Sequence, residues 1–393
     1  MSVYAITDYG VKENSQQLQT SAIQAVLDMC KENGGTVVIP KGRFYTAGLM
    51  MYSNTTLLLK EGAELYGSDN CEDYKIFDFP ENVEDRSDIE LIKSYFASKD
   101  WPTPEKRYRR AIISAYGCEN ISIIGERNSV IDGQDCYDPL GEERYRGPHA
   151  VYLTSCKNVL LEGYTAQNSG NFLHEANNCE NLTMRRVTCL AGSDGIHAHC
   201  SKNVLIENCV FKTGDDCIAG INIDGMVIKN CVCNTSCNYF RLGGVHIHCE
   251  NCYFYGPGYY PHRVTIVKGN KNYLPRTEGR HNVEAIIIYF ASEDYPYESS
   301  KDIVFKNCCF DGAGNLLTYH ADNIDFIQRG THLTELIFED CRFMNIERES
   351  FVNASKDEPL TVKLKNITAS FAENSDANSL FDKNSPNLTV IEK

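Results

Sequence analysis

Residues 190–220, LAGSDGIHAHCSKNVLIENCVFKTGDDCIAG, contain the pattern that decides the fold. One phrase in this stretch is a cysteine, an asparagine and an apolar triplet, and it recurs with its cysteine at positions 118, 156, 179 and 200. A second phrase, Asn or Asp followed by cysteine and an aromatic or apolar pair, recurs with its cysteine at positions 209, 231, 252, 308 and 341. Successive copies in the clearest part lie 21 to 23 residues apart. Such a repeat, made of short β-branched segments and Asn/Gly turns, is typical of stacked β-coils.

Equivalent residues of neighbouring coils are expected to form ladders along the stack, because strands of successive coils lie about 4.8 Å apart. We expect the cysteines to form an inward ladder of small apolar side chains. The asparagines are expected to form a ladder at the turns, where they satisfy backbone groups. The sequence therefore predicts an all-β fold, a parallel β-helix or solenoid in which residues 1–393 form one domain.

The N-terminus is predicted to be a helical cap, because Ala22, Val26 and Leu27 follow helical spacing before Gly34 and Gly35 end the pattern. A solenoid needs such a cover over its open edge. The basic run 106–110 ends a stretch predicted to be either a solvated loop or one wall of a binding cleft. The expected organisation is a cap with the first coils at 1–68, an insert at 69–110, regular coils at 111–254, a second insert at 255–300, and C-terminal coils at 301–393 that end in a polar, loose cap from about 371.

Composition excludes several classes of protein. A formal net charge of −15 argues against nucleic acid as a partner, since a phosphate backbone attracts a basic face. Hydrophobic residues make up 42% of the chain, which excludes disorder, and no apolar run reaches the roughly 18 residues of a membrane span. The first residues lack the basic and apolar regions of a signal peptide, and 18 cysteines in repeat register indicate buried thiols. We therefore expect a cytoplasmic location, although a chain whose signal had been removed would look the same.

Three aspartates are predicted to meet at one corner of the solenoid. Asp215 follows Asp194 by 21 residues, one repeat, and Asp216 is its neighbour. Carboxylates packed together repel one another, which raises at least one pKa and keeps a proton available near neutral pH. Hydrolysis of a glycosidic bond uses such a pair, with an acid that protonates the leaving oxygen and a carboxylate that activates water. Capping of turn amides, calcium ligation and simple solvation are the alternatives for these residues.

These motifs, GSDG and GDDC with the opening DYGVKENSQQLQTSAIQAVLDMC, resemble glycoside hydrolase family 28, the polygalacturonases and their relatives, over about residues 5–250. The resemblance implies a right-handed parallel β-helix and an inverting hydrolase that needs no cofactor or metal. It implies that Asp215 is the general acid and that Asp194 and Asp216 activate water. The sequence departs from the family where Gly192 and Ser193 replace Asn-Thr, and where Asn238 stands in place of the histidine of Gly-His-Gly.

The substrate carboxylate of the family is held by Arg-x-Lys, which has no clean counterpart here; Arg263 with Lys268 is the nearest, and Arg276 and Arg280 follow. This concentration of basic residues in an acidic chain favours a uronic acid substrate. A histidine often found in the relatives corresponds to His174. The predicted substrate-binding residues are His174, His197, Asn238, Arg241, Arg263, Lys268 and Arg280.

The expected function is thus an inverting glycoside hydrolase that acts from the chain end on short, uronic-acid-containing pectic oligosaccharides, because a cytoplasmic enzyme meets only imported substrate. A polysaccharide lyase and a non-catalytic glycan-binding β-helix are the alternatives. His246 and His248 alternate on one strand and form either a metal site or an ordinary outward pair.

Overall fold

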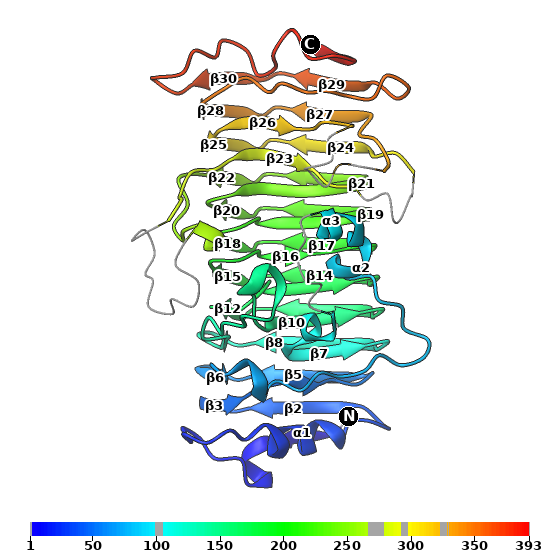
Figure 1. The fold of residues 1–393 in the computed structure, drawn as a ribbon. Helices are drawn as coiled ribbons and strands as arrows, with labels where there is room; N and C mark the ends of the chain where they lie inside the picture. The colour runs from blue at the N-terminus through cyan, green and yellow to red at the C-terminus, as the bar shows by residue number, and fades with distance from the viewer. Residues whose placement is uncertain are drawn as a thin grey trace.

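The chain forms a tall solenoid of parallel strands with its two ends at opposite ends of the stack (Figure 1). The structure, a computed structural model, describes residues 2–98, 105–265, 279–291, 298–322, 328 and 330–392. Each regular coil adds one strand to each of three stacks, and every pairing between named strands is parallel. The predicted all-β class and the parallel β-helix are confirmed.

The strands of the first two stacks belong to one continuous sheet, because β19 and β21 run through both stacks. The first stack consists of β4 (Leu49–Met50), β7 (Ala111–Tyr116), β10 (His149–Thr154), β13 (His174–Asn177), β16 (Ile196–His197), the first parts of β19 (Ile218–Lys229) and β21 (Asn238–Glu250), β23 (Ala285–Tyr289) and β26 (Asn315–Thr318). The second consists of β1 (Val3–Ala5), β2 (Gly35–Ile39), β5 (Thr55–Leu59), β8 (Glu119–Gly125), β11 (Lys157–Glu162), β14 (Glu180–Arg185), β17 (Lys202–Glu207), the later parts of β19 and β21, β24 (Lys301–Lys306), β27 (Glu335–Glu339), β29 (Leu360–Lys365) and β31 (Leu388–Glu392).

The third stack is a separate sheet of eleven strands. It consists of β3 (Gly42–Thr46), β6 (Ala63–Gly67), β9 (Val130–Asp132), β12 (Thr165–Gln167), β15 (Thr188–Ala191), β18 (Val210–Thr213), β20 (Val232–Asn234), β22 (Tyr253–Tyr255), β25 (Cys309–Ala313), β28 (Arg342–Ile346) and β30 (Thr368–Phe371).

The core runs along the axis of the solenoid and is built from equivalent residues of successive coils. Leu182, Val204, Met226 and Ile247 occupy one register position of the second stack, and all four are buried. All 18 cysteines carry free thiols and 17 of them are buried. Eight of the nine repeat cysteines lie in the main core, as predicted, whereas Cys200 lies in a second apolar cluster and Ser201 takes the register position of Cys179. The sulfurs of the core cysteines accompany the apolar ladders as compact filler, which a close-packed interior requires.

Asparagines form the predicted turn ladder. Asn120, Asn158, Asn181 and Asn203 all adopt positive φ between 53° and 57°, a region that asparagine tolerates better than most residues. Each side-chain amide donates to the Oδ1 of the asparagine one coil before, over 2.9, 3.1 and 3.2 Å from Asn158, Asn181 and Asn203 respectively. The repeated asparagine therefore both permits the bend and links neighbouring coils.

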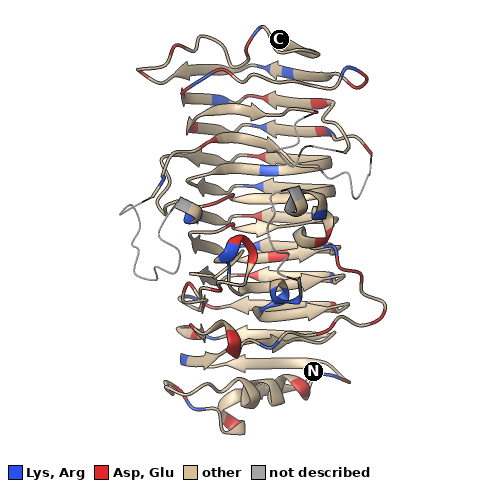
Figure 2. Cartoon of the chain, viewed as in Figure 1, with Lys and Arg blue, Asp and Glu red and all other residues tan. Residues whose placement is uncertain are grey.

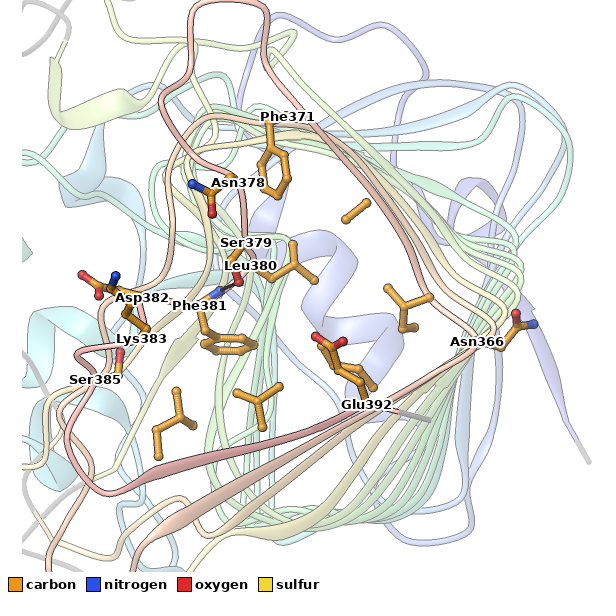
Figure 3. Close-up of a pocket in the computed structure, with 15 residues that line it drawn as sticks. Asn366, Phe371, Asn378, Ser379, Leu380, Phe381, Asp382, Lys383, Ser385 and Glu392 are labelled. Atoms are coloured by element: carbon orange, nitrogen blue, oxygen red, sulfur yellow. Dashed lines mark hydrogen bonds between the residues drawn. The ribbon is translucent and has the colours of Figure 1, made fainter.

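The N-terminal end is closed by α1 (Thr20–Asp28), preceded by the short helix η1 (Ile6–Tyr9). Ile23, Val26 and Leu27 of α1 are buried in the main core, so the predicted cap is confirmed. At the other end the predicted loose cap is wrong in part, because β31 pairs with β29. A hollow of about 770 Å³ lies over this last coil, and Leu364, Phe371 and Leu388 help to line it (Figure 3).

The insert at 69–110 contains η2 (Cys71–Asp73), α2 (Asp88–Leu91), α3 (Lys93–Ser98) and η3 (Glu105–Arg109). Ile89, Leu91 and Tyr108 join a second apolar cluster with Tyr152 and Phe172. Tyr152 and Phe172 belong to the outward side of the first stack, so this insert covers that face instead of forming a solvated loop. That the insert forms one wall of a binding cleft stays a prediction.

The insert at 255–300 was predicted to interrupt the coils throughout, which is wrong, because it contains β23 in its regular place in the first stack. The short helix η5 (Arg263–Thr265) precedes β23. A further excursion, 133–148, leaves the coil between β9 and β10 and contains η4 (Glu142–Arg144). The sequence analysis missed it, because the repeat phrases on either side continue in register.

Acidic and basic residues are interspersed along the stack in the view of Figure 2. Arg107 and Arg110 of the basic run 106–110 both contact Asp138, which ties the first insert to the excursion 133–148. Among the described residues no helix has the length and apolar character that crossing a membrane requires.

Candidate active site

The three predicted aspartates meet, as one-repeat spacing requires. Asp194 lies between β15 and β16, and Asp215 and Asp216 lie between β18 and β19. Ile196 pairs with Ile218, so Asp194 and Asp216 occupy the same register position in neighbouring coils. One carboxylate oxygen of each aspartate lies within 4.8 Å of the others. Relative exposures of 1%, 8% and 1% for Asp194, Asp215 and Asp216 show that solvent reaches this group mainly at Asp215.

Asp215 is held in its ionised form by two basic residues from the excursions. Arg146 Nη2 donates to its Oδ2 over 2.8 Å, and His262 Nε2 lies 3.5 Å from its Oδ1. Burial alone would raise the pKa of Asp215, but His262 and the Arg146 guanidinium outweigh burial and hold this pKa well below its ordinary value. Gly214 permits the approach, since a Cβ there would lie 2.0 Å from the carbonyl oxygen of Pro261, next to His262.

Asp216 has a different environment. Asn238 Nδ2 donates to its Oδ1 over 2.7 Å, and Arg241 Nη1 lies 3.9 Å from its Oδ2. Burial and the charge of Asp215 raise the pKa of Asp216 to about 6, against the opposing effects of Arg241 and Asn238. The predicted site residues Asn238 and Arg241 therefore both contact the carboxylate group, and Asn238 stands one coil beyond Asp216 at the same register position.

Asp194 contacts His197, which the sequence analysis also selected. His197 Nε2 hydrogen-bonds Asp194 Oδ2, while Asp194 Oδ1 is buried and has no hydrogen-bond partner among the described residues. Burial and the charges of Asp215 and Asp216 raise the pKa of Asp194 well above its ordinary value. Three buried carboxylates at this distance do not all ionise, so the group retains protons at a pH where isolated aspartates have lost theirs.

The prediction that His174 binds substrate is wrong. His174 shares its register position with Val151 and Ile196, both core residues, so its ring points into the solenoid. Its Nδ1 lies 3.1 Å from the carbonyl oxygen of Gly195 and its Nε2 lies 2.9 Å from the hydroxyl of Tyr164. His174 thus contacts, from the core side, the turn that carries Asp194.

The basic residues of the second insert are less concentrated at the carboxylates than predicted. Arg263 forms a buried ion pair with Asp135, and Arg280 pairs with Glu284 while its Nη2 lies 3.7 Å from Cys237 Sγ. Arg263 therefore joins the second insert to the excursion 133–148, and its role in binding substrate stays a prediction. Lys268 and Arg276 lie outside the described residues.

Sequence reasoning missed Arg146 and His262, the two basic residues that contact Asp215. Arg146 lies in GEERYRGPH, whose density of charge was the available signal, but nothing in the repeat relates it to Asp215. His262 precedes Arg263, and the arginine alone was selected. Both residues come from excursions, whose contacts do not follow from the coil register.

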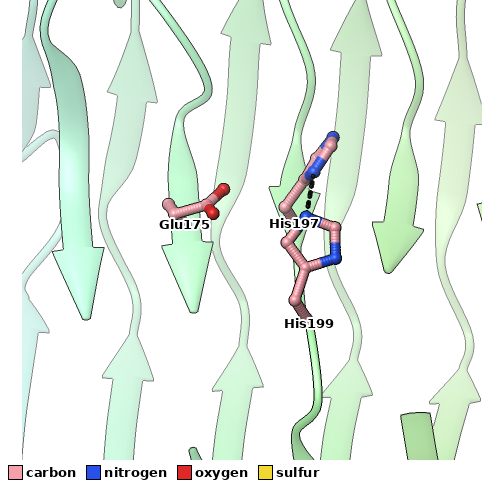
Figure 4. A group of neighbouring side chains, drawn as sticks. All are labelled: Glu175, His197 and His199. Atoms are coloured by element: carbon pink, nitrogen blue, oxygen red, sulfur yellow. Dashed lines mark hydrogen bonds between the residues drawn. The ribbon is translucent and has the colours of Figure 1, made fainter. Parts of the chain in front are cut away.

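Several groupings among the described residues resemble metal sites in composition. Asp215, Cys237 and His262 bring potential ligand atoms within 4.8 Å of one another, as the three aspartates do. Glu175, His197 and His199 each bring a potential ligand atom within 4.8 Å of the others (Figure 4), but the ring nitrogens of both histidines already make hydrogen bonds. His246 and His248 lie outward and both contact Asp302, over 2.8 and 3.1 Å. This surface arrangement matches the outward pair, the simpler of the two predicted alternatives.

Residues 81–237 match the sequence profile described as Glycosyl hydrolases family 28. A curated relative, the exo-poly-alpha-D-galacturonosidase of Dickeya chrysanthemi, is 28% identical over 268 residues, which cover 55% of this chain and 41% of that protein. Over residues 81–237 the chain is thus similar to glycoside hydrolase family 28. The matched part of the chain spans less than half the length of the Dickeya relative.

Solved structures share the fold of this chain at low identity. The hyperthermoactive exopolygalacturonase of Thermotoga maritima matches with a TM-score of 0.68 at 15% identity, over 100% of this chain and 91% of that one. The family 28 exopolygalacturonase of Yersinia enterocolitica matches with a TM-score of 0.60 at 17% identity, over 100% and 78% of the two chains. Both comparisons agree with the parallel β-helix described above.

Proposed function

We propose that this chain is an inverting glycoside hydrolase of family 28 that releases sugar units from the ends of short galacturonate-containing oligosaccharides. The observation that carries the proposal is the group formed by Asp194, Asp215 and Asp216 within 4.8 Å, in which the pKa of Asp215 is held below its ordinary value and those of Asp194 and Asp216 are raised. The match of residues 81–237 to family 28 supports the hydrolase chemistry. The exopolygalacturonase and exo-galacturonosidase names of the relatives support galacturonate and end-wise cleavage.

The reaction needs one proton at the leaving oxygen and one carboxylate that removes a proton from water. Asp215 is the most exposed of the three aspartates and stands where a glycosidic oxygen can reach it. We assign it as the acid. Asp194 Oδ1 and Asp216 lie deeper, at the same register position of neighbouring coils. We assign them to activate the attacking water. Asn238 Oδ1, which has no hydrogen-bond partner among the described residues, accepts a substrate hydroxyl.

Asp215 is ionised in the free protein, so it must gain a proton before it acts. Arg146 Nη2 is the group that stabilises the charge, at 2.8 Å. A uronate carboxylate beside Asp215 competes for this guanidinium, since arginine binds carboxylates with matched geometry. When Arg146 bonds to the substrate instead, the pKa of Asp215 rises. A proton then moves to Asp215 from one of the other two aspartates. The negative charge of the substrate thus prepares the acid.

End-wise action fits the enclosed position of the carboxylates, because Asp194 and Asp216 are almost wholly buried and solvent reaches the group at one residue. We propose short substrates on the basis of the cytoplasmic location expected from the cysteine-rich sequence. Inversion is proposed from the family, and the close approach of the three carboxylates makes a direct stereochemical measurement necessary.

The test is product analysis on saturated oligogalacturonides of defined length, with wild type beside Asp215→Asn and the matched control Asp224→Asn. Asp224 is a half-exposed carboxylate on β19, outside the group. We expect wild type and Asp224→Asn to release saturated galacturonate, with inverted anomeric configuration by NMR, and Asp215→Asn to be inactive. An unsaturated, ultraviolet-absorbing product would identify a lyase instead. Binding of the oligosaccharides without turnover would identify a glycan-binding protein.

A further inference from the structure

A chain of hydrogen bonds leads from a backbone amide to Asp194. The N–H of Ile221 lies 3.0 Å from Nδ1 of His199, and Nε2 of His199 lies 3.0 Å from Nδ1 of His197. Nε2 of His197 hydrogen-bonds Oδ2 of Asp194. Figure 4 shows the two rings joined in this way, with Glu175 beside them.

The direction of every bond in this chain follows from its first member. An amide N–H only donates, so Nδ1 of His199 accepts, and the single proton of its neutral ring is on Nε2. Nε2 of His199 therefore donates to Nδ1 of His197, which leaves the proton of His197 on its own Nε2. That N–H donates to Asp194. The tautomer of each ring is thus determined by its neighbour.

The surroundings keep both rings neutral and in place. His197 and His199 are fully buried, and the His197 ring stacks on Phe172 with centroids 3.8 Å apart and planes 13° from parallel. Burial lowers the pKa of His199 to about 3, and burial together with His199 and the nearby arginines lowers that of His197. A second proton on His197 would have to enter at Nδ1, against the N–H of His199.

We propose that His199 and His197 are positioning residues that make Oδ1 of Asp194 its working oxygen. This inference rests on the proposed hydrolase function. Oδ2 is occupied by the His197 donor, so a proton taken from water by Asp194 is received by Oδ1, the oxygen without a hydrogen-bond partner in the described part of the chain. The two rings thereby determine which lone pair faces the water, as orienting groups do for catalytic bases.

The kinetic test compares His199→Leu with His199→Gln. The glutamine amide offers an oxygen to the Ile221 amide and an N–H₂ to His197, so it preserves the direction of the chain, whereas leucine removes both groups. We expect His199→Leu to lower kcat about tenfold or more with little change in KM, because an oriented, charge-assisted bond is lost. His199→Gln should stay within about threefold of wild type. Equal losses in the two variants, at matched folded fractions by urea titration, would overturn the proposal.

The second test reads the rings directly and does not depend on activity. Long-range ¹H–¹⁵N spectra of wild type should show both histidines neutral with the proton on Nε2. In His199→Leu, the Nδ1 of His197 loses its donor, so its ¹⁵N resonance should move to the position of an unprotonated nitrogen without a hydrogen bond, while in His199→Gln it should stay close to that of wild type. A wild-type His197 with a proton on Nδ1 would contradict the relay. If these spectra agree but no oligosaccharide is cleaved, the hydrogen-bond relay stands and the proposed hydrolase function fails.

Discussion

Replacement of Arg146 by glutamine tests the electrostatic basis of the site. The Arg146 guanidinium is 6% exposed and contacts Asp215 Oδ2 at 2.8 Å and Glu143 Oε2 at 2.8 Å. Its neutral replacement leaves the buried Asp215 carboxylate without the cation. Breaking a buried ion pair by removing one partner typically costs about 3–5 kcal/mol, and we expect a loss of that size in the free energy of unfolding near neutral pH.

The pH dependence has a defined sign. In wild type the pKa of Asp215 lies below the ordinary value of about 3.9. Its ionised form therefore contributes stability at a pH above about 4, and this contribution disappears as the pH falls through the folded-state pKa. In Arg146→Gln burial raises the pKa of Asp215, so the native state favours the protonated form. The stability gap between the two proteins should be largest at neutral pH and shrink toward about pH 4.

Urea unfolding at about pH 7.5 and about pH 4.5 measures this gap. Arg127→Gln is the matched control, because Arg127 is 77% exposed and pairs with the half-exposed Glu61, a contact worth less than about 1 kcal/mol. The double variant Arg146→Gln/Asp215→Asn should recover part of the loss. A loss no larger than that of the control, or one equal at both pH values, would refute the reasoning.

Three further predictions concern the same physics. Asp216→Asn should raise the free energy of unfolding by up to about 3 kcal/mol at about pH 8 and change it little at about pH 4. The reason is that the folded-state pKa of Asp216, about 6, lies above its unfolded value, so this residue makes the wild type less stable as the pH rises. Urea titrations at the two pH values check this prediction. Arg241→Gln removes a charge that lowers the pKa of Asp216, so the acidic limb of kcat/KM should move to higher pH. Asn181→Ala should cost about 1–2 kcal/mol in thermal or urea unfolding, and Asn181→Gly less, since φ is 57° there.

The fold and the central part of the site follow from sequence because they depend on one-dimensional periodicity. A repeat near 22 residues is enough to predict that Cys209 stacks on the preceding coil and that Asn181 lies between Asn158 and Asn203 in the turn ladder. The same arithmetic brings Asp194 beside Asp216, since residues one repeat apart share a register position. Asn238 was selected from the resemblance, in place of the histidine of Gly-His-Gly, and it stands one coil beyond Asp216.

The electrostatics of the site were decided by tertiary structure. Arg146 and His262 reach Asp215 from excursions whose paths are independent of the repeat, so no spacing relates them to it. His174 was placed on the wrong side because strand alternation within a coil, and not its distance from the aspartates, determines which face it takes. The tautomers of His197 and His199 depend on the Ile221 amide one coil away. Periodicity predicts which backbone positions are neighbours. The charge state of a titratable side chain depends instead on which other side chains exclude water from it.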